Sequence, residues 1–132
     1  MTSVSISNKN KRYYQKNKEV IREKNKKWRK ENSDLVRLWN QTPKRRFGVY
    51  VINARKKGID FALTFEEFGK LVSSLCHYCG DEGYGVDRKE SDVGYVANNV
   101  VSCCTSCNFF KRKLGYEEFI TKCIRISNNF IK

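Results

Sequence analysis

Two Cys-x-x-Cys pairs, Cys76–Cys79 and Cys104–Cys107, are the residues in this sequence whose type and spacing are best suited to chemistry. Each pair brings two thiolates to one point, and two such pairs provide a tetrahedral set of soft ligands that suits Zn²⁺. Four protein ligands leave no coordination position for water, so the metal would be structural. We therefore expect one structural zinc ion, although four unrelated thiols are the alternative interpretation.

Three other residues could compete for that metal. Cys103 could replace Cys104, but the two-residue spacing favours Cys104 and leaves Cys103 facing the core from the end of a strand. His77 lies inside the first pair, where a loop histidine more often faces solvent. Cys123 falls on an apolar helical stripe, which favours a small core residue over a ligand.

The segment between the two pairs predicts the elements that position them. Residues 85–87 and 100–102 read as two short strands joined by a polar loop that contains glycine. The second cysteine pair then begins a helix that carries Asn108, Lys111, Arg112 and Lys113. The sequence thus predicts a strand–loop–strand–helix unit held by zinc at both ends.

Apolar periodicity predicts further elements around this unit. A helix from Pro43, with Phe47, Tyr50, Val51 and Ala54 on one face, should end at Gly58, and residues 59–63 alternate like a short strand. Thr64 to Glu67 form a capping box before another helix. Two apolar stripes should be buried: Phe65, Phe68, Leu71, Val72 and Leu75 in that helix, and Tyr116, Phe119, Ile120, Cys123 and Ile124 in a C-terminal one.

The charge is concentrated near the N-terminus. The 132 residues carry a formal net charge of +13, and residues 1–46, with 15 basic and four acidic side chains, account for +11 of it. We expect residues 1–42 to be a basic arm of two helices, capped by Asn17 and Ser33, and residues 43–132 to be the folded domain. The simpler alternative is a solvated lysine-rich leader.

Composition and the N-terminal sequence indicate the cellular compartment of the protein. A mean hydropathy of −0.68 argues against a membrane span, and the polar N-terminus lacks the apolar run of a secretory signal. We therefore expect an intracellular protein in a reducing compartment, where cysteines serve as metal ligands or core residues rather than as disulfides.

A longer combination of residues resembles a known family. The matching residues are 76–80 (Cys-His-Tyr-Cys-Gly), 86–88 (Val-Asp-Arg), 94–95 (Gly-Tyr), 99–108 (Asn-Val-Val-Ser-Cys-Cys-Thr-Ser-Cys-Asn) and Lys111. These motifs lie within residues 45–126, and over this range the sequence resembles the HNH endonucleases, in particular the small zinc-bearing members of phages, viruses and introns. The resemblance implies an α+β fold: a zinc-stapled ββα-metal core flanked by helices, with the basic helical arm at its N-terminus.

The resemblance also implies a catalytic site. Asp87 and Asn108 would share one Mg²⁺ or Mn²⁺ ion, and Asn99 would hold the loop in register. Arg88 departs from the family, whose usual histidine takes the proton from water. A guanidinium does not act as a base, but it grips phosphate well. Glu90 is then the first choice of base, ahead of a cation-bound hydroxide and His77, and an ion pair of Asp87 with Arg88 that steadies the loop is the structural alternative.

These residues lead to two functional hypotheses. The first is a metal-dependent DNA endonuclease acting on double-stranded DNA, with its oligomeric state left open and a monomer favoured slightly. The second is a non-catalytic, zinc-stabilised nucleic-acid-binding module on the same scaffold. A zinc-stabilised interaction domain that binds no nucleic acid fits the +11 arm poorly. The side chains expected to contact nucleic acid are all basic: Lys24, Lys26, Lys27, Arg29, Lys30, Lys44, Arg45, Arg46, Arg55, Lys56, Lys57, Lys111, Arg112 and Lys113.

Overall fold

In the computed structural model of this protein, the backbone is described from Ser3 to Ile131 and the side chains from Asn8 to Ile131. The chain divides into two compact units, of which the first ends at Gln41 and the second begins at Thr42.

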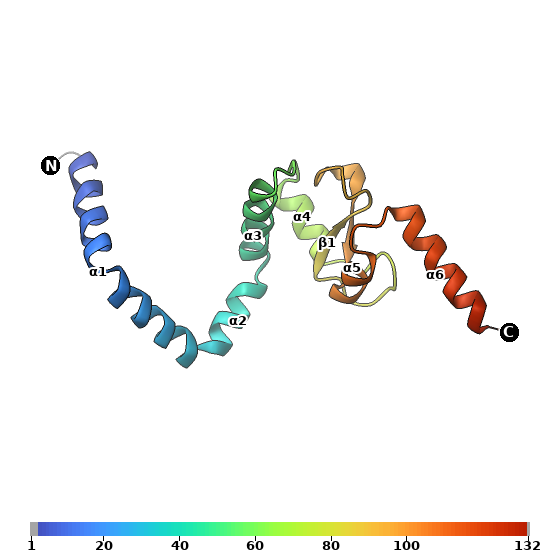
Figure 1. The fold of residues 1–132 in the computed structure, drawn as a ribbon, viewed down its shortest axis with the longest axis horizontal. Coiled ribbons are helices and arrows are strands. Elements are labelled where there is room, and N and C mark those ends of the chain that lie inside the picture. The colour runs from blue at the N-terminus through green and yellow to red at the C-terminus, as the bar shows by residue number, and fades with distance from the viewer. Residues whose placement is uncertain (1–2, 132) are drawn as a thin grey trace. The chain divides into compact units, whose positions relative to one another are not determined.

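The first unit consists of two successive helices, α1 (Ser3–Glu31) and α2 (Ser33–Gln41) (Figure 1). The prediction that Asn17 caps a helix is wrong, because α1 runs through it without a break. The Asn17 side-chain amide instead donates to the carbonyl of Tyr13, four residues earlier in the same helix. The second helix begins with Ser33 inside it, and the carbonyl of Asn32, one residue earlier, accepts the N–H of Val36. Both helices leave large apolar side chains in solvent, among them Trp28 and Leu38, and α2 has no buried residue.

The second unit begins with α3 (Pro43–Lys56), whose N-cap is Thr42 and which is followed by Gly58 at a φ of +65°. Helix α4 (Phe65–Val72) follows, and the predicted capping box is confirmed by reciprocal bonds between Thr64 and Glu67. Phe68 is fully buried, but the expected burial of Phe65 and Leu75 is wrong. Leu75 lies beyond the end of α4 and is therefore exposed, and Phe65 is half exposed at its first turn.

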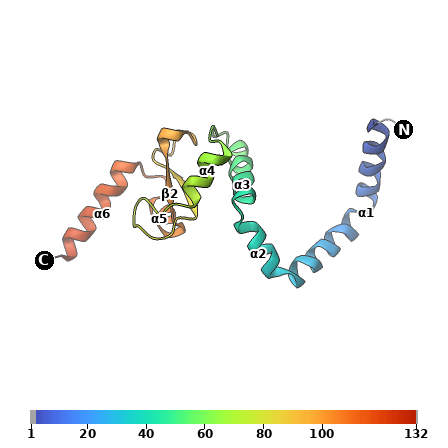
Figure 2. The ribbon, with the colours of Figure 1, turned by 180° about the vertical axis from the view of Figure 1, so that it is seen from behind.

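A two-stranded antiparallel sheet lies next to α4. Strand β1 (Gly85–Arg88) pairs with β2 (Val100–Cys103) in the register Asp87 to Val101, and a short 3-10 helix, η1 (Ala97–Asn99), leads into β2. Helix α5 (Thr105–Lys111) follows β2 directly, and Figure 2 labels the two elements side by side. The predicted strand–loop–strand–helix unit is confirmed.

The predicted strand over residues 59–63 is wrong. This segment makes a single parallel bridge, between Phe61 and Tyr95, beside the backbone bonds of Asp60 and Ala62 to Tyr95. One bridge fixes the loop after β1 against this segment, but it does not extend the sheet.

The C-terminal helix α6 (Tyr116–Phe130) forms as predicted, but most of its apolar stripe is exposed. Phe119 is its one buried residue, and the expected core positions of Cys123 and Ile124 are wrong because both are exposed. The first turn of α6 packs on the unit through Tyr116 and Phe119, whose rings both contact the ring of Tyr78.

The core of the second unit is small and aromatic. Leu63, Phe68, Val72, Val86 and Val100 are buried together, with Phe47, Tyr50, Phe61, Leu71 and Tyr95 packed around them. A second cluster contains Cys76, Cys103 and Cys104. The hairpin and α5 are therefore held between an aromatic core and a cysteine cluster.

None of the helices in residues 3–131 combines the length and the apolar character needed to span a bilayer.

Candidate functional site

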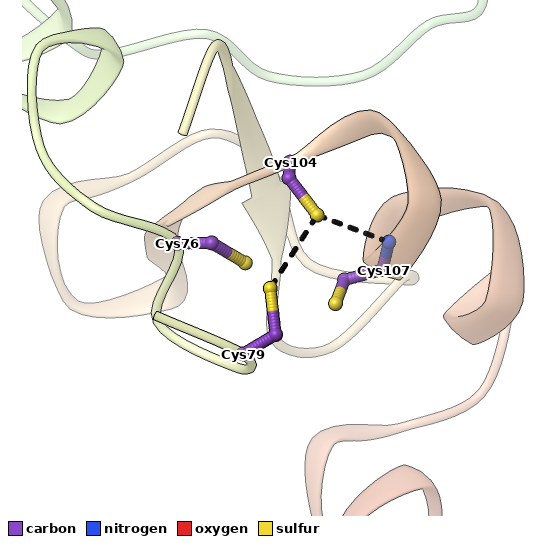
Figure 3. A group of neighbouring side chains, drawn as sticks. All are labelled: Cys76, Cys79, Cys104 and Cys107. Atoms are coloured by element: carbon purple, nitrogen blue, oxygen red, sulfur yellow. Dashed lines mark hydrogen bonds between the residues drawn. The ribbon is translucent and has the colours of Figure 1, made fainter. Parts of the chain in front are cut away.

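Four cysteine side chains converge at one point, as predicted (Figure 3). The sulfur atoms of Cys76, Cys79, Cys104 and Cys107 all lie within 4.8 Å of one another, and those of Cys79 and Cys104 are 3.7 Å apart. A Zn–S bond of about 2.3 Å implies tetrahedron edges of about 3.8 Å. The cluster can therefore hold a metal ion such as zinc.

Backbone geometry places these thiols. The first pair lies in a tight loop in which the Gly80 N–H donates to the Cys76 carbonyl, and the positive φ of Gly80 suits a glycine. Cys104 is the N-cap of α5, and its sulfur accepts the N–H of Cys107. Burial alone would raise the pKa of Cys76, but N–H groups of Cys104, Cys79 and Tyr78 outweigh it and lower that pKa to about 6. Cys76 therefore forms the thiolate that a metal requires more readily than Cys107, whose pKa is raised by burial.

Cys103 and His77 are not among the four residues whose ligand atoms converge. The thiol of Cys103 is buried and donates to the carbonyl of Cys104, and burial raises its pKa. His77 instead bonds through Nε2 to the hydroxyl of Tyr116, at 3.0 Å. Within residues 8–131 the metal-ligand group is thus the one predicted, with Cys104 rather than Cys103.

A separate polar pocket of about 400 Å³ lies where α3, β1, the following loop and α5 meet. Asp87 and Asn108 both line it, so the structure brings together the two residues expected to share a cation. The complete lining is Val49, Tyr50, Asn53, Lys57, Val86, Asp87, Arg88, Ser91, Tyr95, Asn108 and Arg112.

The carboxylate of Asp87 is buried and held from two sides. Its Oδ2 accepts a hydrogen bond from the Tyr78 hydroxyl at 2.7 Å and lies 3.3 Å from the ammonium of Lys111. Burial and this hydrogen bond to Asp87 raise the pKa of Tyr78, which therefore remains a donor. Lys111 also donates to the carbonyl of Arg88, at 2.8 Å.

The expectation that Lys111 contacts nucleic acid is wrong. Its side chain is fully buried and its ammonium is directed at β1, because α5 packs this face against the hairpin. The spacing held a signal for this, since Lys111 follows Cys107 by four residues and so shares the inward face of α5. Sequence reasoning also missed Tyr78, which contacts Asp87, and Tyr50, whose hydroxyl accepts the N–H of Val86.

Arg88 steadies the loop after β1. Its Nη1 donates to the carbonyls of Ser91 and Val93, and its guanidinium lies 5.2 Å from the centroid of the Tyr95 ring. The alternative of an Asp87–Arg88 ion pair does not hold, because Asp87 pairs with Lys111. Arg88 nevertheless lines the pocket, next to Asp87.

Asn99 fastens the same loop by four side-chain bonds. Its Oδ1 accepts the N–H of Glu90, and its Nδ2 donates to the carbonyls of Glu90, Val93 and Gly94. Asn99 is itself buried. It therefore holds the loop in register, as the resemblance implied.

The structure contradicts Glu90 as the base. Its Oε1 accepts the N–H of Tyr116, the first residue of α6, and its Oε2 lies 2.8 Å from where a Cβ on Gly115 would be. Glu90 thus faces the start of α6 and does not line the pocket. A carboxylate at a helix N-terminus is favourable there, because it accepts an unpaired N–H.

The predicted basic residues divide by position. Lys57 and Arg112 line the pocket, whereas Lys44, Arg55, Lys56 and Lys113 are exposed elsewhere on the second unit and Arg45 and Arg46 are half-buried. The basic residues of α1 are exposed: Lys24, Lys26, Lys27, Arg29 and Lys30. Two of the predicted cations therefore lie beside Asp87 and Asn108.

Comparisons with known proteins concern the fold of the chain. No protein-family model matches the chain. It is 40% identical over 97 residues, 70% of its length, to an uncharacterized protein of Acanthamoeba polyphaga mimivirus, and it spans only 18% of that larger protein. Among solved structures it is similar to the rare-cutting HNH restriction endonuclease PacI, with a TM-score of 0.53 and 22% identity, covering 67% of this chain and 79% of that one.

The likeness to PacI rests on the fold, which the antiparallel hairpin, α5 and the four-cysteine cluster define in this chain. The α+β fold that the resemblance implied is therefore confirmed, because the chain shares its fold with an HNH restriction endonuclease and has a four-cysteine cluster that can hold a metal ion.

Proposed function

We propose that this chain is a metal-dependent DNA endonuclease that hydrolyses phosphodiester bonds in the pocket between α3, β1 and α5. The observation that carries the proposal is that Asp87 and Asn108, from two different elements, line one pocket together with Arg88, Lys57 and Arg112. Asp87 and Asn108 offer the oxygen ligands that a divalent metal requires. The three cations offer the positive charge that binds a phosphodiester.

The donor set of the pocket fits Mg²⁺ or Mn²⁺. The bonds that Tyr78 and Lys111 make with Asp87 both go to Oδ2, so Oδ1 is the oxygen that we assign to the cation. The Asn108 carboxamide is exposed on α5 and offers a second oxygen. When bound, such a cation supplies Lewis acidity, which lowers the pKa of a coordinated water and stabilises negative charge on phosphate.

The surrounding side chains then have distinct tasks. Tyr78 and Lys111 orient the Asp87 carboxylate, while Lys57, Arg88 and Arg112 bind the phosphate. The exposed cations of α1 add affinity for the DNA backbone that does not depend on sequence.

One observation favours the second hypothesis, a nucleic-acid-binding module without efficient catalysis. Among the residues that line the pocket, Asp87 is the one carboxylate and there is no histidine, so a water molecule has no dedicated side-chain base. The same protein would then bind DNA through Lys57, Arg88 and Arg112 without cutting it.

A plasmid-nicking assay with Mg²⁺ or Mn²⁺ separates the two hypotheses. Asp87→Asn and Asn108→Ala should abolish nicking while DNA binding persists. Asp92→Asn and Asn98→Ala are matched controls, because both residues are exposed in the same region and neither lines the pocket. Nicking that survives Asp87→Asn would refute the site, and binding without nicking in either metal would favour the second hypothesis.

A further inference from the structure

Two adjacent phenylalanines on α5 are exposed where the helix leaves the pocket. The side chains of Phe109 and Phe110 are 62% and 69% exposed, immediately after Asn108. Two large aromatic rings in water are unfavourable by themselves, and exposed apolar residues beside a functional pocket commonly serve binding.

Phe109 is connected to the pocket through Arg112. The Arg112 guanidinium lies 4.8 Å from the centroid of the Phe109 ring, and Arg112 also lines the pocket with Asn108. Asn108, Arg112 and the exposed ring of Phe109 therefore lie next to one another at the end of α5.

The backbone at Arg112 gives an independent indication. Arg112 has φ 51° and ψ −114°, and it is the one residue other than glycine with a positive φ among those described. The Leu114 N–H bonds to the Lys111 carbonyl, so Lys111–Leu114 form a turn whose first central residue is ordinarily glycine. A long side chain held at a glycine position indicates that the side chain is needed there.

We propose that Phe109 and Arg112 form a stacking surface for a nucleobase that has left its base stack, next to the phosphate bound in the pocket. The inference rests on the proposed function and names its substrate class: DNA with unpaired or unstacked bases at the cleaved position. Aromatic rings and guanidinium planes both stack on bases without regard to sequence, and cations along the backbone complete such sites. Lys57, Arg112 and Lys113 supply that charge.

Charge favours a base over a second copy of the chain as the occupant. An apolar groove of about 630 Å³ between α5 and α6 is lined by Phe110, Phe119 and Cys123, among others, and a protein partner would suit it. Phe109 does not line that groove and lies against a cation, and another copy of a protein of net charge +13 would be repelled there.

The test is DNA binding by the full chain without added divalent cation, so that no cleavage intervenes. The probes are a single strand that contains 2-aminopurine and the matching duplex, each titrated at several salt concentrations. Phe109→Leu keeps the apolar bulk but removes the aromatic face that would stack on a base, whereas Phe109→Trp keeps an aromatic face. Phe130→Leu, at an exposed phenylalanine on α6, is the matched control.

We expect Phe109→Leu to weaken single-strand binding by about tenfold, the Trp variant and the control to stay within about twofold, and the duplex to change less. The salt dependence should stay unchanged, since the cations that bind the phosphates are all still present, and quenching of 2-aminopurine should disappear with Leu. Arg112→Gly should raise the melting temperature while reducing the same quenching, because glycine adopts a positive φ without strain.

Equal single-strand affinity of the Leu and Trp variants would overturn the inference, as would an effect of Phe109→Leu on oligomeric state instead of DNA affinity. These readouts need no cleavage. If Asp87→Asn abolishes nicking but leaves 2-aminopurine quenching unchanged, the stacking surface is supported. If the unmodified chain does not nick DNA, the result contradicts the proposed endonuclease activity but not the stacking surface.

Discussion

The ammonium of Lys111 and the carboxylate of Asp87 lie 3.3 Å apart, and both residues are buried, with Asp87 lining the polar pocket. Lys111 is on α5 and Asp87 on β1, so the ion pair joins the helix to the hairpin. The Tyr78 hydroxyl donates to the same carboxylate, and the Arg88 carbonyl accepts from the same ammonium. A buried pair satisfied in this way positions its members, and it makes each costly to remove alone.

The first prediction concerns this pair. Lys111→Met should destabilise the second unit by about 3–5 kcal/mol, because it leaves the Asp87 charge buried without its partner. Asp87→Asn in the same chain should restore most of that stability, since the charge is then gone. Urea unfolding of the single and double variants measures both. Strictly additive destabilisation would show that the two residues do not act as a pair.

The second prediction concerns the metal. Purified protein should contain one zinc ion per chain, and Cys104→Ser should lose it together with the fold of the second unit, because the binding energy of the metal is folding energy. Cys103→Ser is the matched control, because Cys103 is not among the four clustered ligands and its thiol donates to the backbone carbonyl of Cys104. Elemental analysis and circular dichroism provide the measurements, and zinc retained by Cys104→Ser but absent from Cys103→Ser would reverse the ligand assignment.

The third prediction is a pH dependence at the start of α4. The backbone N–H and then the hydroxyl of Thr64 lower the pKa of Glu67 below its ordinary value of 4.5. The carboxylate therefore contributes stability above pH 4.5, and this contribution disappears as the pH falls through the lowered pKa of the folded state.

Glu67→Gln should accordingly lower the melting temperature near neutral pH and have no such effect in acid. Glu66→Gln is the control, because Glu66 is in the same turn and makes an exposed ion pair with Lys70. Thermal melts of the three proteins across the acidic range would contradict the assignment if the Glu66 and Glu67 variants changed in parallel.

The fourth prediction separates Glu90 from the chemistry. Glu90→Gln should leave nicking within about twofold, because its side chain faces the first turn of α6 and a carboxamide oxygen can accept the same Tyr116 N–H. Glu90→Ala should lower the melting temperature by removing that helix-terminal acceptor. A large drop in nicking rate in the Gln variant, with unchanged stability, would return Glu90 to the role of base.

The fifth prediction concerns the basic helix α1. Replacement of Lys24, Lys26, Lys27, Arg29 and Lys30 by glutamine should weaken DNA binding and reduce its salt dependence, by about 0.9 in the logarithmic slope for each phosphate that these cations neutralise. The melting temperature of the second unit should not change. Lys122→Gln with Arg125→Gln on α6 is the control, and an equal slope in all proteins would exclude α1 from the DNA interface.

Local sequence determined much of this protein. The two Cys-x-x-Cys spacings are sufficient to predict a four-thiol site, because each pair closes within one tight turn. The capping box at Thr64 and the strands around Asp87 likewise depend on neighbouring residues, so their positions could be read directly. Asn17 failed as a cap because an asparagine can equally bond back within an uninterrupted helix.

Only the tertiary structure decided which side chains face which. The spacing from Cys107 puts Lys111 on the inward face of α5, but its burial and its pairing with Asp87 follow from the packing of α5 on β1. Glu90 lies two residues from Arg88 in the chain, yet its carboxylate meets α6, 26 residues later. The spacing of residues determines which face of a helix or strand a side chain occupies. Contacts between elements depend on how those faces pack, and this packing decides what Lys111, Tyr78 and Glu90 contact.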